Sequence, residues 1–471
     1  MASSEIGTAT GPAKLKAVTD LVEKLTNDLD NVTLLPDDRI SALEELKIYG
    51  RDPNDADPIF TKDGISMLLR HGFYSPSSET ARAALRVLAN AMLLKPETRQ
   101  TFVDLGFAPR ACSELKVDSW DNEFLVSRIL FISTYGTSLD LPDLIENHRL
   151  ADHIVENVSR HAKTLSNKAK AKDDPMEGMA LGETLKLMFN VSHFCKDKVS
   201  CFTATVPHVV ALLWKQDVSD ENPLDPPFGP LVNALYNLDF EADKSRASLF
   251  PKSEPTKVSS RLVSLLDLSM KAYGDNELEN NVTPLVGLIG RVYENAPPAV
   301  RQFLEEAILP SAEDRQAVLG RGETLSARLL KNSTNPLTPA LRDGISHLFF
   351  DLSGRDASKF VENVGYGFAS GFLFQNNVPV PASASEAFST GDDAGAQKLV
   401  NPITGQFLDK ENPAEGPEMS QEEKEREAER LFVLFERLKQ LGIMDIQNPV
   451  EQAVQEGKFR ELDDDEVEEV D

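Results

Sequence analysis

A short pattern with helical spacing recurs along this chain and ends each time in asparagine. The three copies are Leu85-x-x-Leu88-x-Asn90, Leu185-x-x-Met188-x-Asn190 and Val232-x-x-Leu235-x-Asn237. Apolar residues three or four positions apart share one side of a helix, so each copy predicts a helix with a buried side and an amide at its edge. Recurrence of such a unit predicts stacked helices with a row of polar groups along one groove. A groove of that kind favours binding of an extended partner.

The spacing of the copies indicates the type of repeat. Asn190 and Asn237 lie 47 residues apart, whereas the 100 residues between Asn90 and Asn190 contain a further helical segment at 128–131 and span two units. Armadillo and HEAT repeats have this period. Their helices bury their apolar sides only by stacking into a curved solenoid with a concave face. We therefore predict an all-α fold, an armadillo/HEAT-like α-solenoid over residues 1–374. Its clearest helices are expected at residues 80–94, 123–134, 183–194, 230–240, 281–295 and 339–352.

The character of the sequence changes after residue 374. Residues 375–418 are expected to form a flexible linker, because their first part is rich in Asn, Pro, Ala, Ser and Asp. A C-terminal helix is expected over 419–448: Ser420 and Glu423 have capping-box spacing, and Leu431 and Phe435 share an apolar side. Residues 449–471 are expected to be an acidic, disordered tail, since 461–471 carry eight acids and no base.

Composition excludes several classes of protein. The net charge of −27 over 471 residues argues against a nucleic-acid partner, which needs clustered Lys and Arg. Three cysteines do not make a disulfide framework and fit a reducing compartment. The N-terminus shows no secretory signal, and no apolar run reaches the ~20 residues of a membrane span. A cytoplasmic protein is the simplest expectation.

The residues that could carry chemistry favour binding over catalysis. The glycine cluster at 365–371 has the wrong spacing for a dinucleotide loop and instead predicts a tight turn where two helices approach. His193, Cys195 and Cys201 match no zinc pattern, and packing explains the two cysteines better. The remaining candidates, His148, His153 and His161, are expected at the surface of helices. We find no nucleophile–base motif, so neither an enzyme with covalent chemistry nor a metal or other cofactor is expected.

Two sets of residues are candidates for partner contacts. Each motif asparagine either cross-links neighbouring helices or holds the backbone of a bound peptide, and the sequence favours neither. Lys47 and Arg51 are four positions apart, which predicts one helical face that could receive an anionic group or remain solvated. Ser389 and Thr390 are each followed three residues later by Asp, which suits an acidophilic kinase.

Several segments together resemble the synembryn family, of the resistance-to-inhibitors-of-cholinesterase type. Gly-Tyr-Gly followed by Asn-Pro-Ile-Thr-Gly and then a charged helix is the specific part of the resemblance, and it extends in the family's order over most of the chain. Phe368-Ala369-Ser370 replace the family's usual Asn-Ala-Ala, and the acidic phosphorylation cluster is thinner, which is similar to a divergent, fungal member. The segments are LRVLAN at 85–90, RILF at 128–131, LKLMFN at 185–190, VNALYNL at 232–238, FLEEAILP at 303–310, GYGFASG at 365–371, NPITG at 401–405 and MSQEEKEREAERL at 419–431.

The resemblance implies a guanine nucleotide exchange factor and folding chaperone for heterotrimeric G-protein α subunits. A monomer would hold the C-terminal helix of the α subunit, GDP-bound or nucleotide-free, in its groove as a 1:1 complex, and the partner could recruit it to the cell cortex. The alternative is a generic armadillo adaptor for another peptide, although the Trp–Asn pairs of nuclear-import adaptors are missing. Residues that the resemblance places against the partner are Lys47, Arg51, Asn90, Phe131, Phe189, Asn190, Asn233, Leu431 and Phe435.

Overall fold

A computed structural model of the chain describes residues 9–166, 174–381, 388–390 and 398–411. Helices make up most of these residues, which confirms the predicted all-α solenoid. The chain divides into two compact units, Met1–Asp409 and Lys410–Asp471. The first unit extends past residue 374, where the sequence predicts that the solenoid ends. None of the described helices is both long and apolar enough to span a membrane.

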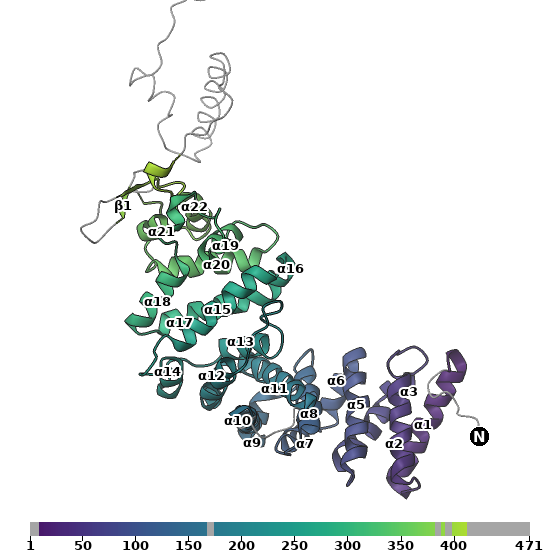
Figure 1. The fold of residues 1–471 in the computed structure, drawn as a ribbon. Coiled ribbons are helices and arrows are strands. Elements are labelled where there is room, and N and C mark those ends of the chain that lie inside the picture. Colours follow the sequence, from purple (N-terminus) through teal and green to yellow (C-terminus); the bar gives the residue numbers. More distant parts are fainter. Residues whose placement is uncertain (1–8, 167–173, 382–387, 391–397, 412–471) are drawn as a thin grey trace, which may run out of the picture. The chain divides into compact units, whose positions relative to one another are not determined.

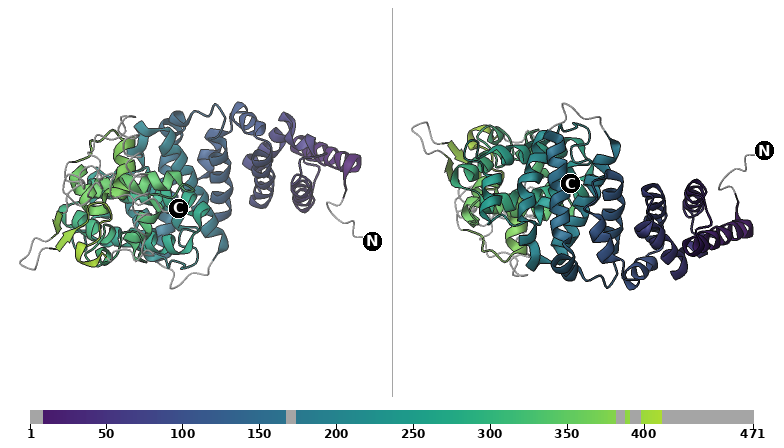
Figure 2. Two further views of the ribbon diagram at one scale, coloured as in Figure 1. Left: turned by 90° about the horizontal axis from the view of Figure 1, so that it is seen from above. Right: turned by 90° about the horizontal axis from the view of Figure 1, so that it is seen from below.

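Seven helices pack side by side, each against the next, and we call them the row (Figures 1 and 2). Contacts join matching parts of neighbouring helices, so they are parallel and their C-terminal ends lie at one edge. For example, the middles of the third and fourth meet at Ser127 and Thr184, and their ends meet at Thr134 and Asn190. The row consists of α2 (Pro36–Tyr49), α5 (Ser78–Leu94), α8 (Trp120–Ser133), α11 (Pro175–Phe194), α13 (Phe228–Tyr236), α17 (Thr283–Asn295) and α20 (Pro339–Leu352).

The other elements precede, connect or follow the members of the row. The remaining α-helices are α1 (Gly11–Asn31), α3 (Asp57–Phe60), α4 (Lys62–Tyr74), α6 (Glu97–Asp104), α7 (Ala108–Glu114), α9 (Leu141–His148), α10 (Leu150–Ser166), α12 (Val206–Lys215), α14 (Asp243–Leu249), α15 (Lys257–Ala272), α16 (Asp275–Glu277), α18 (Pro298–Ile308), α19 (Leu325–Asn332), α21 (Ala357–Val364) and α22 (Tyr366–Gln375). Shorter turns are the 3-10 segments Lys196–Thr205, Asp314–Gln316 and Leu408–Lys410 and the π-helical turn Leu278–Val282.

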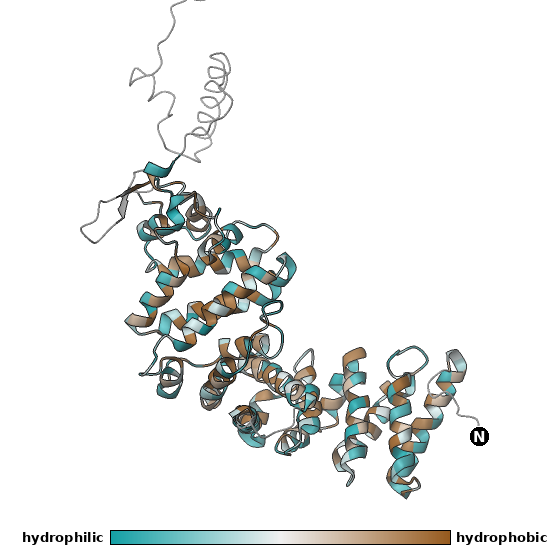
Figure 3. Cartoon of the chain, viewed as in Figure 1, coloured by the Kyte–Doolittle hydropathy of each residue, from teal (hydrophilic) through white to brown (hydrophobic). Residues whose placement is uncertain are grey.

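The motif that recurs in the sequence forms the core of the row. In all three copies both large apolar residues are buried, while the asparagine lies toward or just beyond the helix C-terminus. Each buried Leu, Met or Val contributes roughly 1.5–3 kcal/mol relative to an exposed one. Figure 3 shows the same alternation of apolar and polar sides along the helices. The six helices predicted most clearly are all members of the row, because row helices contact neighbours on two sides and therefore carry many buried apolar residues.

Helix boundaries differ from prediction where capping decides them. Asp174 accepts a hydrogen bond from the backbone N–H of Met176, so α11 begins at Pro175, eight residues before the predicted start at 183. Two glycines in this stretch lower its helix propensity, so the sequence did not indicate that the helix begins here. At the other extreme, α13 ends at Tyr236 although residues to 240 were expected to be helical. Asn237 takes the cap position there, and its side chain bonds elsewhere.

Arginine side chains cover the C-terminal ends of six helices. A guanidinium bound to the last carbonyl oxygens of a helix satisfies acceptors that have no partner within it and complements the helix dipole. Four of these arginines lie more than 35 residues from the carbonyls they bind, so they join different repeats. The six are Arg99 on α5, Arg110 on α4, Arg261 on α12, Arg291 on α13, Arg301 on α17 and Arg315 on α21.

The glycine cluster meets the Asn-Pro-Ile-Thr-Gly segment in space. Gly365, at a positive φ of 81°, separates α21 from α22, and a Cβ there would lie 3.0 Å from the carbonyl oxygen of Ile403. The backbone N–H groups of Tyr366 and Gly367 donate to the carbonyls of Pro402 and Ile403 at 2.7 and 3.1 Å. The predicted tight turn is therefore present, and α21 and α22 pack against each other across it, with the Phe360 and Phe372 rings 5.5 Å apart. The start of α22 also approaches the later Asn-Pro-Ile-Thr-Gly turn, which was not predicted.

The segment 375–418, expected as a flexible linker, contains regular structure in its described part. Strand β1 (Phe388–Thr390) pairs antiparallel with β2 (Lys398–Val400), with Ser389 opposite Leu399. Isolated three-residue strands carry no alternating pattern long enough to recognise in a sequence. The candidate phosphorylation sites Ser389 and Thr390 lie in β1, whereas Leu431 and Phe435 lie outside the described residues.

Candidate partner-binding surface

Polar and aromatic side chains of the row fall into two sets. The first set, which we call the charged band, lies on α2, α5, α8 and α11 and consists of Glu44, Lys47, Arg82, Arg86, Asp121, Arg128, Glu183 and Lys186. The second set lies near the helix C-termini, and we call it the amide–aromatic band. It consists of Asn90, Phe131, Tyr135, Phe189, Asn190, His193, Phe194, Asn233, Tyr236 and Asn237.

Arg86 is the centre of the charged band. Its guanidinium contacts Asp121 of α8 at 3.1 Å and Glu44 of α2 at 3.8 Å, so one side chain bridges three helices. Arg82, one turn earlier, contacts the same Asp121 at 3.4 Å, and Lys47 pairs with Glu44. These side chains are partly exposed, so each pair contributes little to stability, ~0–1 kcal/mol.

The charged band continues onto α11 and keeps an excess of cations. Glu183 accepts from Arg128 at 3.1 Å and from Lys186 at 2.9 Å. Five cations therefore share three carboxylates in this band, in a chain whose net charge is −27. Such a local excess of positive charge suits an acidic or carboxylate-bearing ligand.

Two of the motif asparagines cross-link the row. The buried Asn190 donates from Nδ2 to the hydroxyl of Thr134 at 2.7 Å and accepts from the Tyr135 hydroxyl at 3.4 Å, which ties α11 to the end of α8. Asn237 donates to the carbonyl oxygen of Phe189 at 3.1 Å and ties α13 to α11. For Asn190 and Asn237, these contacts support the interpretation that the motif asparagine cross-links neighbouring helices.

Asn90 and Asn233 differ from this pair. Both are half-buried on α5 and α13, and neither side-chain amide makes a hydrogen bond to another residue in the described part of the chain. An amide has two donors and an acceptor to satisfy. These two side chains are therefore available to a ligand, a difference that the identical sequence motif of Asn90 and Asn190 could not reveal.

Exposed aromatic residues accompany the asparagines, and sequence reasoning missed three of them. Tyr135, Phe194 and Tyr236 are 44%, 53% and 36% exposed at the ends of successive row helices. The rings of Phe131 and Tyr135 meet edge to face with their centroids 5.3 Å apart, and the rings of Phe189 and His193 are stacked with their centroids 6.0 Å apart. Exposed aromatic groups of this kind are enriched where proteins contact one another. The signal in the sequence was their place three to five residues after each predicted contact residue.

The basic pair does not form the single helical face expected from its spacing. Helix α2 ends at Tyr49 with Gly50 as its cap, so Arg51 lies in the following turn and is exposed. Lys47 remains on the helix, half-buried beside Glu44. The backbone N–H of Gly50 bonds to the carbonyls of Leu46 and Ile48 and closes the last turn, so the helix ends two residues before Arg51.

A buried polar cluster lies behind the row, where α8, α10 and α11 meet. Glu123 is fully buried and accepts from the Arg160 guanidinium at 2.5 Å, from Nε2 of His161 at 2.9 Å and from the Thr184 hydroxyl at 2.6 Å. Burial acts to raise the pKa of Glu123, but these partners outweigh it and hold that pKa below 4.5. His161 and His153 are thus buried, contrary to the expected surface positions. The polar neighbours of His161 are on α8 and α11, so local spacing in the sequence does not reveal them, whereas the polar neighbour of His153 is Glu156 of its own helix.

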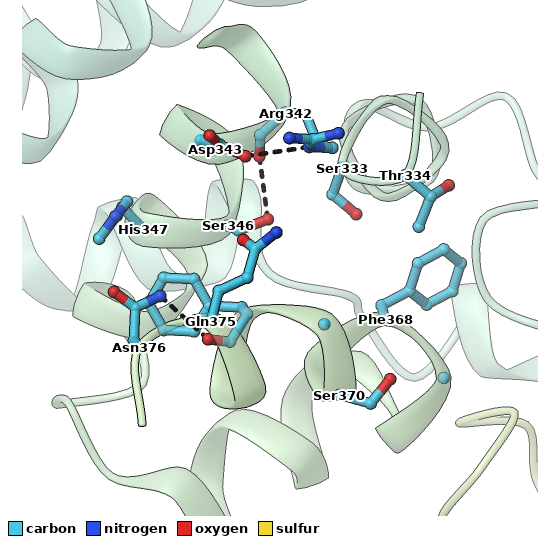
Figure 4. A pocket seen from close by; sticks show the side chains of 13 residues that line it. Ser333, Thr334, Arg342, Asp343, Ser346, His347, Phe368, Ser370, Gln375 and Asn376 are labelled. Atoms are coloured by element: carbon cyan, nitrogen blue, oxygen red, sulfur yellow. Dashed lines mark hydrogen bonds and ion pairs between the residues drawn. The ribbon is translucent and has the colours of Figure 1, made fainter. Parts of the chain in front are cut away.

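A polar cavity of about 420 Å³ lies at the other end of the row, between α20, α22 and the turn after α19 (Figure 4). Arg342 and Asp343 pair at its rim, and Gln375 extends toward Ser346. Gly367 and Gly371 of the glycine cluster also line it. It offers donors and acceptors in similar number and so specifies no single ligand charge.

The described ranges contain no group of three or more His, Cys, Asp or Glu side chains that could hold a metal ion. Cys195 is buried and Cys201 is exposed. Packing therefore accounts for Cys195, as expected, but not for Cys201.

The family model of the guanine nucleotide exchange factor synembryn matches residues 42–458, which include the row except for the first residues of α2. The chain belongs to the synembryn family. Curated synembryn relatives align over most of their length: a synembryn-like chaperone of Schizosaccharomyces pombe is 23% identical over 448 residues, covering 89% of this chain and 83% of the relative. Chaperone Ric-8A of Macaca fascicularis is 23% identical (89% and 84% covered), and that of Xenopus laevis is 26% identical (87% and 82%). The resemblance seen in the sequence is thereby confirmed.

Proposed function

We propose that this protein is an exchange factor and folding chaperone for heterotrimeric G-protein α subunits and that it binds their C-terminal helix along the row. The observation that supports this most strongly is the family match over residues 42–458. The row adds a surface of fitting chemistry, with an excess of cations in the charged band and exposed aromatic groups beside two amides that bond to no other residue in the described part of the chain.

The two bands suit different parts of one amphipathic helix. Its acidic side chains or terminal carboxylate pair with cations of the charged band and with Arg51, through charge-assisted hydrogen bonds. Its apolar side packs on Phe131 and Phe189, and its polar groups bond the amides of Asn90 and Asn233. Asn190 supports this surface by holding Tyr135 and Thr134 in place. The segment that contains Leu431 and Phe435, which the sequence predicts to be a helix, contacts the nucleotide-binding side of the partner.

Exchange follows from linkage and needs no covalent step. A protein that binds the nucleotide-free α subunit more tightly than the GDP-bound form must weaken GDP binding by the same factor. Withdrawing the partner's C-terminal helix loosens the guanine end of the nucleotide site, GDP leaves, and GTP rebinding releases the chaperone. The same preference stabilises a newly made, empty α subunit. Binding takes place in the cytoplasm or, with the partner, at the cell cortex.

The test is GDP release and complex formation with purified α subunits, each with and without its last several residues. We expect faster release and a 1:1 complex with the intact subunit, and neither with the truncated one. Release at the intrinsic rate and no complex with any α class would refute the proposal. Equal binding of truncated subunits would place the contact elsewhere.

Charge reversal maps the surface. Arg51→Glu and Lys47→Glu should each weaken the complex, by about tenfold if one charged contact is lost. Lys47→Glu places a second carboxylate beside Glu44, whereas Lys47→Gln only removes the positive charge. Comparing the two variants separates the loss of the lysine from the effect of the new carboxylate. The matched control is Lys252→Glu, an exposed cation in the turn after α14 and outside the row. If the control weakens binding as much as Arg51→Glu, the effect is long-range charge and not contact.

The alternative function is an armadillo adaptor for another acidic or amphipathic peptide, which the same two bands would also fit. It predicts binding of such peptides with no effect on GDP release. Comparing a peptide from the C-terminus of an α subunit with a scrambled peptide of equal charge separates the two functions.

A further inference from the structure

A second concave site lies away from both bands, at the beginning of α11. It is a cavity of about 390 Å³, within the range of ~300–1,000 Å³ typical of ligand sites. The end of α10, the first turns of α11, α12 and the turn before α13 enclose it. Its lining residues are His161, Leu165, Asp174, Pro175, Glu177, Gly178, Leu181, Leu212, Gln216, Pro226 and Pro227.

The base of the cavity holds an acceptor without a partner. His161 is 1% exposed, and its Nε2 contacts the carboxylate of Glu123 at 2.9 Å. An ionised carboxylate only accepts, so Nε2 carries a proton, and when the ring holds that single proton Nδ1 has a lone pair. Nδ1 is buried and bonds to no residue in the described ranges; Glu177 Oε1 is 4.0 Å away. A buried polar atom without a partner calls for an explanation.

The walls and mouth define the kind of group that fits. Leu165, Leu181, Leu212 and the two prolines are apolar, whereas Asp174 and Glu177 place two carboxylates at the mouth. Neither lysine nor arginine is among the described lining residues, so the lining charge is negative. The start of a helix ordinarily attracts anions, but here its own carboxylates already occupy that position. The site therefore suits a cation on an aliphatic stem.

We propose that this cavity binds an arginine side chain of a partner protein, with the methylene stem on the apolar walls and the guanidinium between Glu177 and Nδ1 of His161. A guanidinium has five N–H donors in a planar fork, so it can donate to two separate acceptors at once, which a single ammonium nitrogen does less well. The site is on the side of α11 away from the amide–aromatic band and does not depend on the proposed exchange activity.

Binding of Nα-acetyl-arginine amide to the full-length protein tests the proposal, by calorimetry at about pH 8, where imidazole is ordinarily neutral. The citrulline analogue has the same shape without the charge, and the lysine analogue has an ammonium. We expect saturable binding of the arginine compound, at least tenfold weaker binding of citrulline and weaker binding of lysine. Equal affinity for arginine and citrulline would overturn the proposal.

Two variants locate the site without disturbing the buried cluster. Glu177→Gln removes the acceptor charge, and Gly178→Leu fills the cavity from a position where an added Cβ meets no atom within 4 Å. Both should lower affinity at least tenfold, while Glu156→Gln, an exposed carboxylate on α10, should not. Unchanged affinity in Glu177→Gln contradicts the assignment even if Gly178→Leu fails to fold.

One competitor for the site is in the chain itself. Lys168, Lys170 and Lys172 are close in sequence to α11 and lie outside the described residues. A triple Lys→Gln variant should bind the arginine compound as the parent does. Binding that appears only in the triple variant would mean that the chain fills its own site, and the partner proposal would fail. GDP release should be normal in Glu177→Gln, so a failure here is distinguishable from a failure of the proposed function.

Discussion

The guanidinium of Arg315 donates a hydrogen bond to the carbonyl oxygen of Gly405, 90 residues later in the chain, at 3.0 Å. The same side chain donates to the carbonyls of Glu362 and Asn363 at the end of α21, at 2.9 and 3.1 Å. One buried arginine thus joins the Asn-Pro-Ile-Thr-Gly turn to the helix before the glycine cluster. The two segments that identify the family in sequence form one structural unit.

Replacing Arg315 should release that unit. Arg315→Met leaves three carbonyl oxygens without a donor, so we expect the free energy of unfolding to fall by about 2–4 kcal/mol. Urea denaturation followed by circular dichroism measures it. Arg321→Met, an exposed arginine in the same connection, is the control and should change stability by about 0.5 kcal/mol or less. Equal effects of the two variants would show that the bonds of Arg315 contribute nothing specific.

Glu123→Gln should destabilise the junction of α8, α10 and α11. The variant leaves Arg160 and His161 without their buried anion, which typically costs about 3–5 kcal/mol. Glu146→Gln, an exposed carboxylate paired with Lys198, is the matched control and should lose less than about 1 kcal/mol. Melting temperatures of both variants, measured at neutral pH, distinguish these outcomes.

Acid should reduce the difference between wild type and Glu123→Gln. Because the pKa of Glu123 is lowered in the folded protein, its stabilisation is present above the unfolded value of 4.5 and is lost as the pH falls through the folded pKa. Stability measured from neutral pH down to acid should therefore decline more steeply in wild type than in the variant. Parallel curves would mean that the charge of Glu123 is not what stabilises the cluster.

Asn90→Ala and Asn190→Ala should separate binding from stability. Asn190→Ala breaks the bridge to Thr134 and Tyr135 and should lower the free energy of unfolding by about 1–3 kcal/mol. Asn90→Ala breaks no bond to a described residue, so stability should be nearly unchanged while affinity for the α subunit falls. Each variant is measured by denaturation and by binding. Full affinity in Asn90→Ala would remove that residue from the contact surface.

Cysteine alkylation should distinguish the three thiols. Burial raises the pKa of Cys112 to about 12 from 9.0, and burial also raises the pKa of Cys195, whereas Cys201 is exposed. Because the thiolate is the reactive form, iodoacetamide should label Cys201 first and Cys112 only after unfolding. Mass spectrometry of timed digests gives the order, and early labelling of Cys112 would contradict its burial.

Local spacing in the sequence was enough to predict six of the seven row helices, because burial against neighbours on two sides gives them many closely spaced apolar residues. Local spacing did not predict which residues of different repeats contact one another. Leu85–Asn90 and Leu185–Asn190 have the same pattern, yet only Asn190 meets Thr134, a partner 56 residues away. His161 likewise has surface-like spacing and a buried partner 38 residues away in Glu123.

The candidate binding residues were predicted from the resemblance to a family more than from the spacing and chemistry of the residues themselves. Lys47 and Arg51 were placed on one face because a helix was assumed to continue past Gly50. The exposed Tyr135, Phe194 and Tyr236 could have been found as aromatic residues at the C-terminal ends of predicted row helices. Whether Asn90, Phe131, Phe189 and Asn233 contact the partner stays a prediction.

The arginines that cover helix ends also bear on how such a chain unfolds. Solenoid stability is nearly a sum of repeat and nearest-neighbour terms, so an array can in principle fray from one end. Arg110, Arg261, Arg291 and Arg315 each bind carbonyls of a helix in another repeat. When one repeat opens, the adjacent helix loses its terminal hydrogen bonds as well as its packing. The penalty for a boundary between folded and unfolded segments therefore increases, and long stretches of the array should melt together.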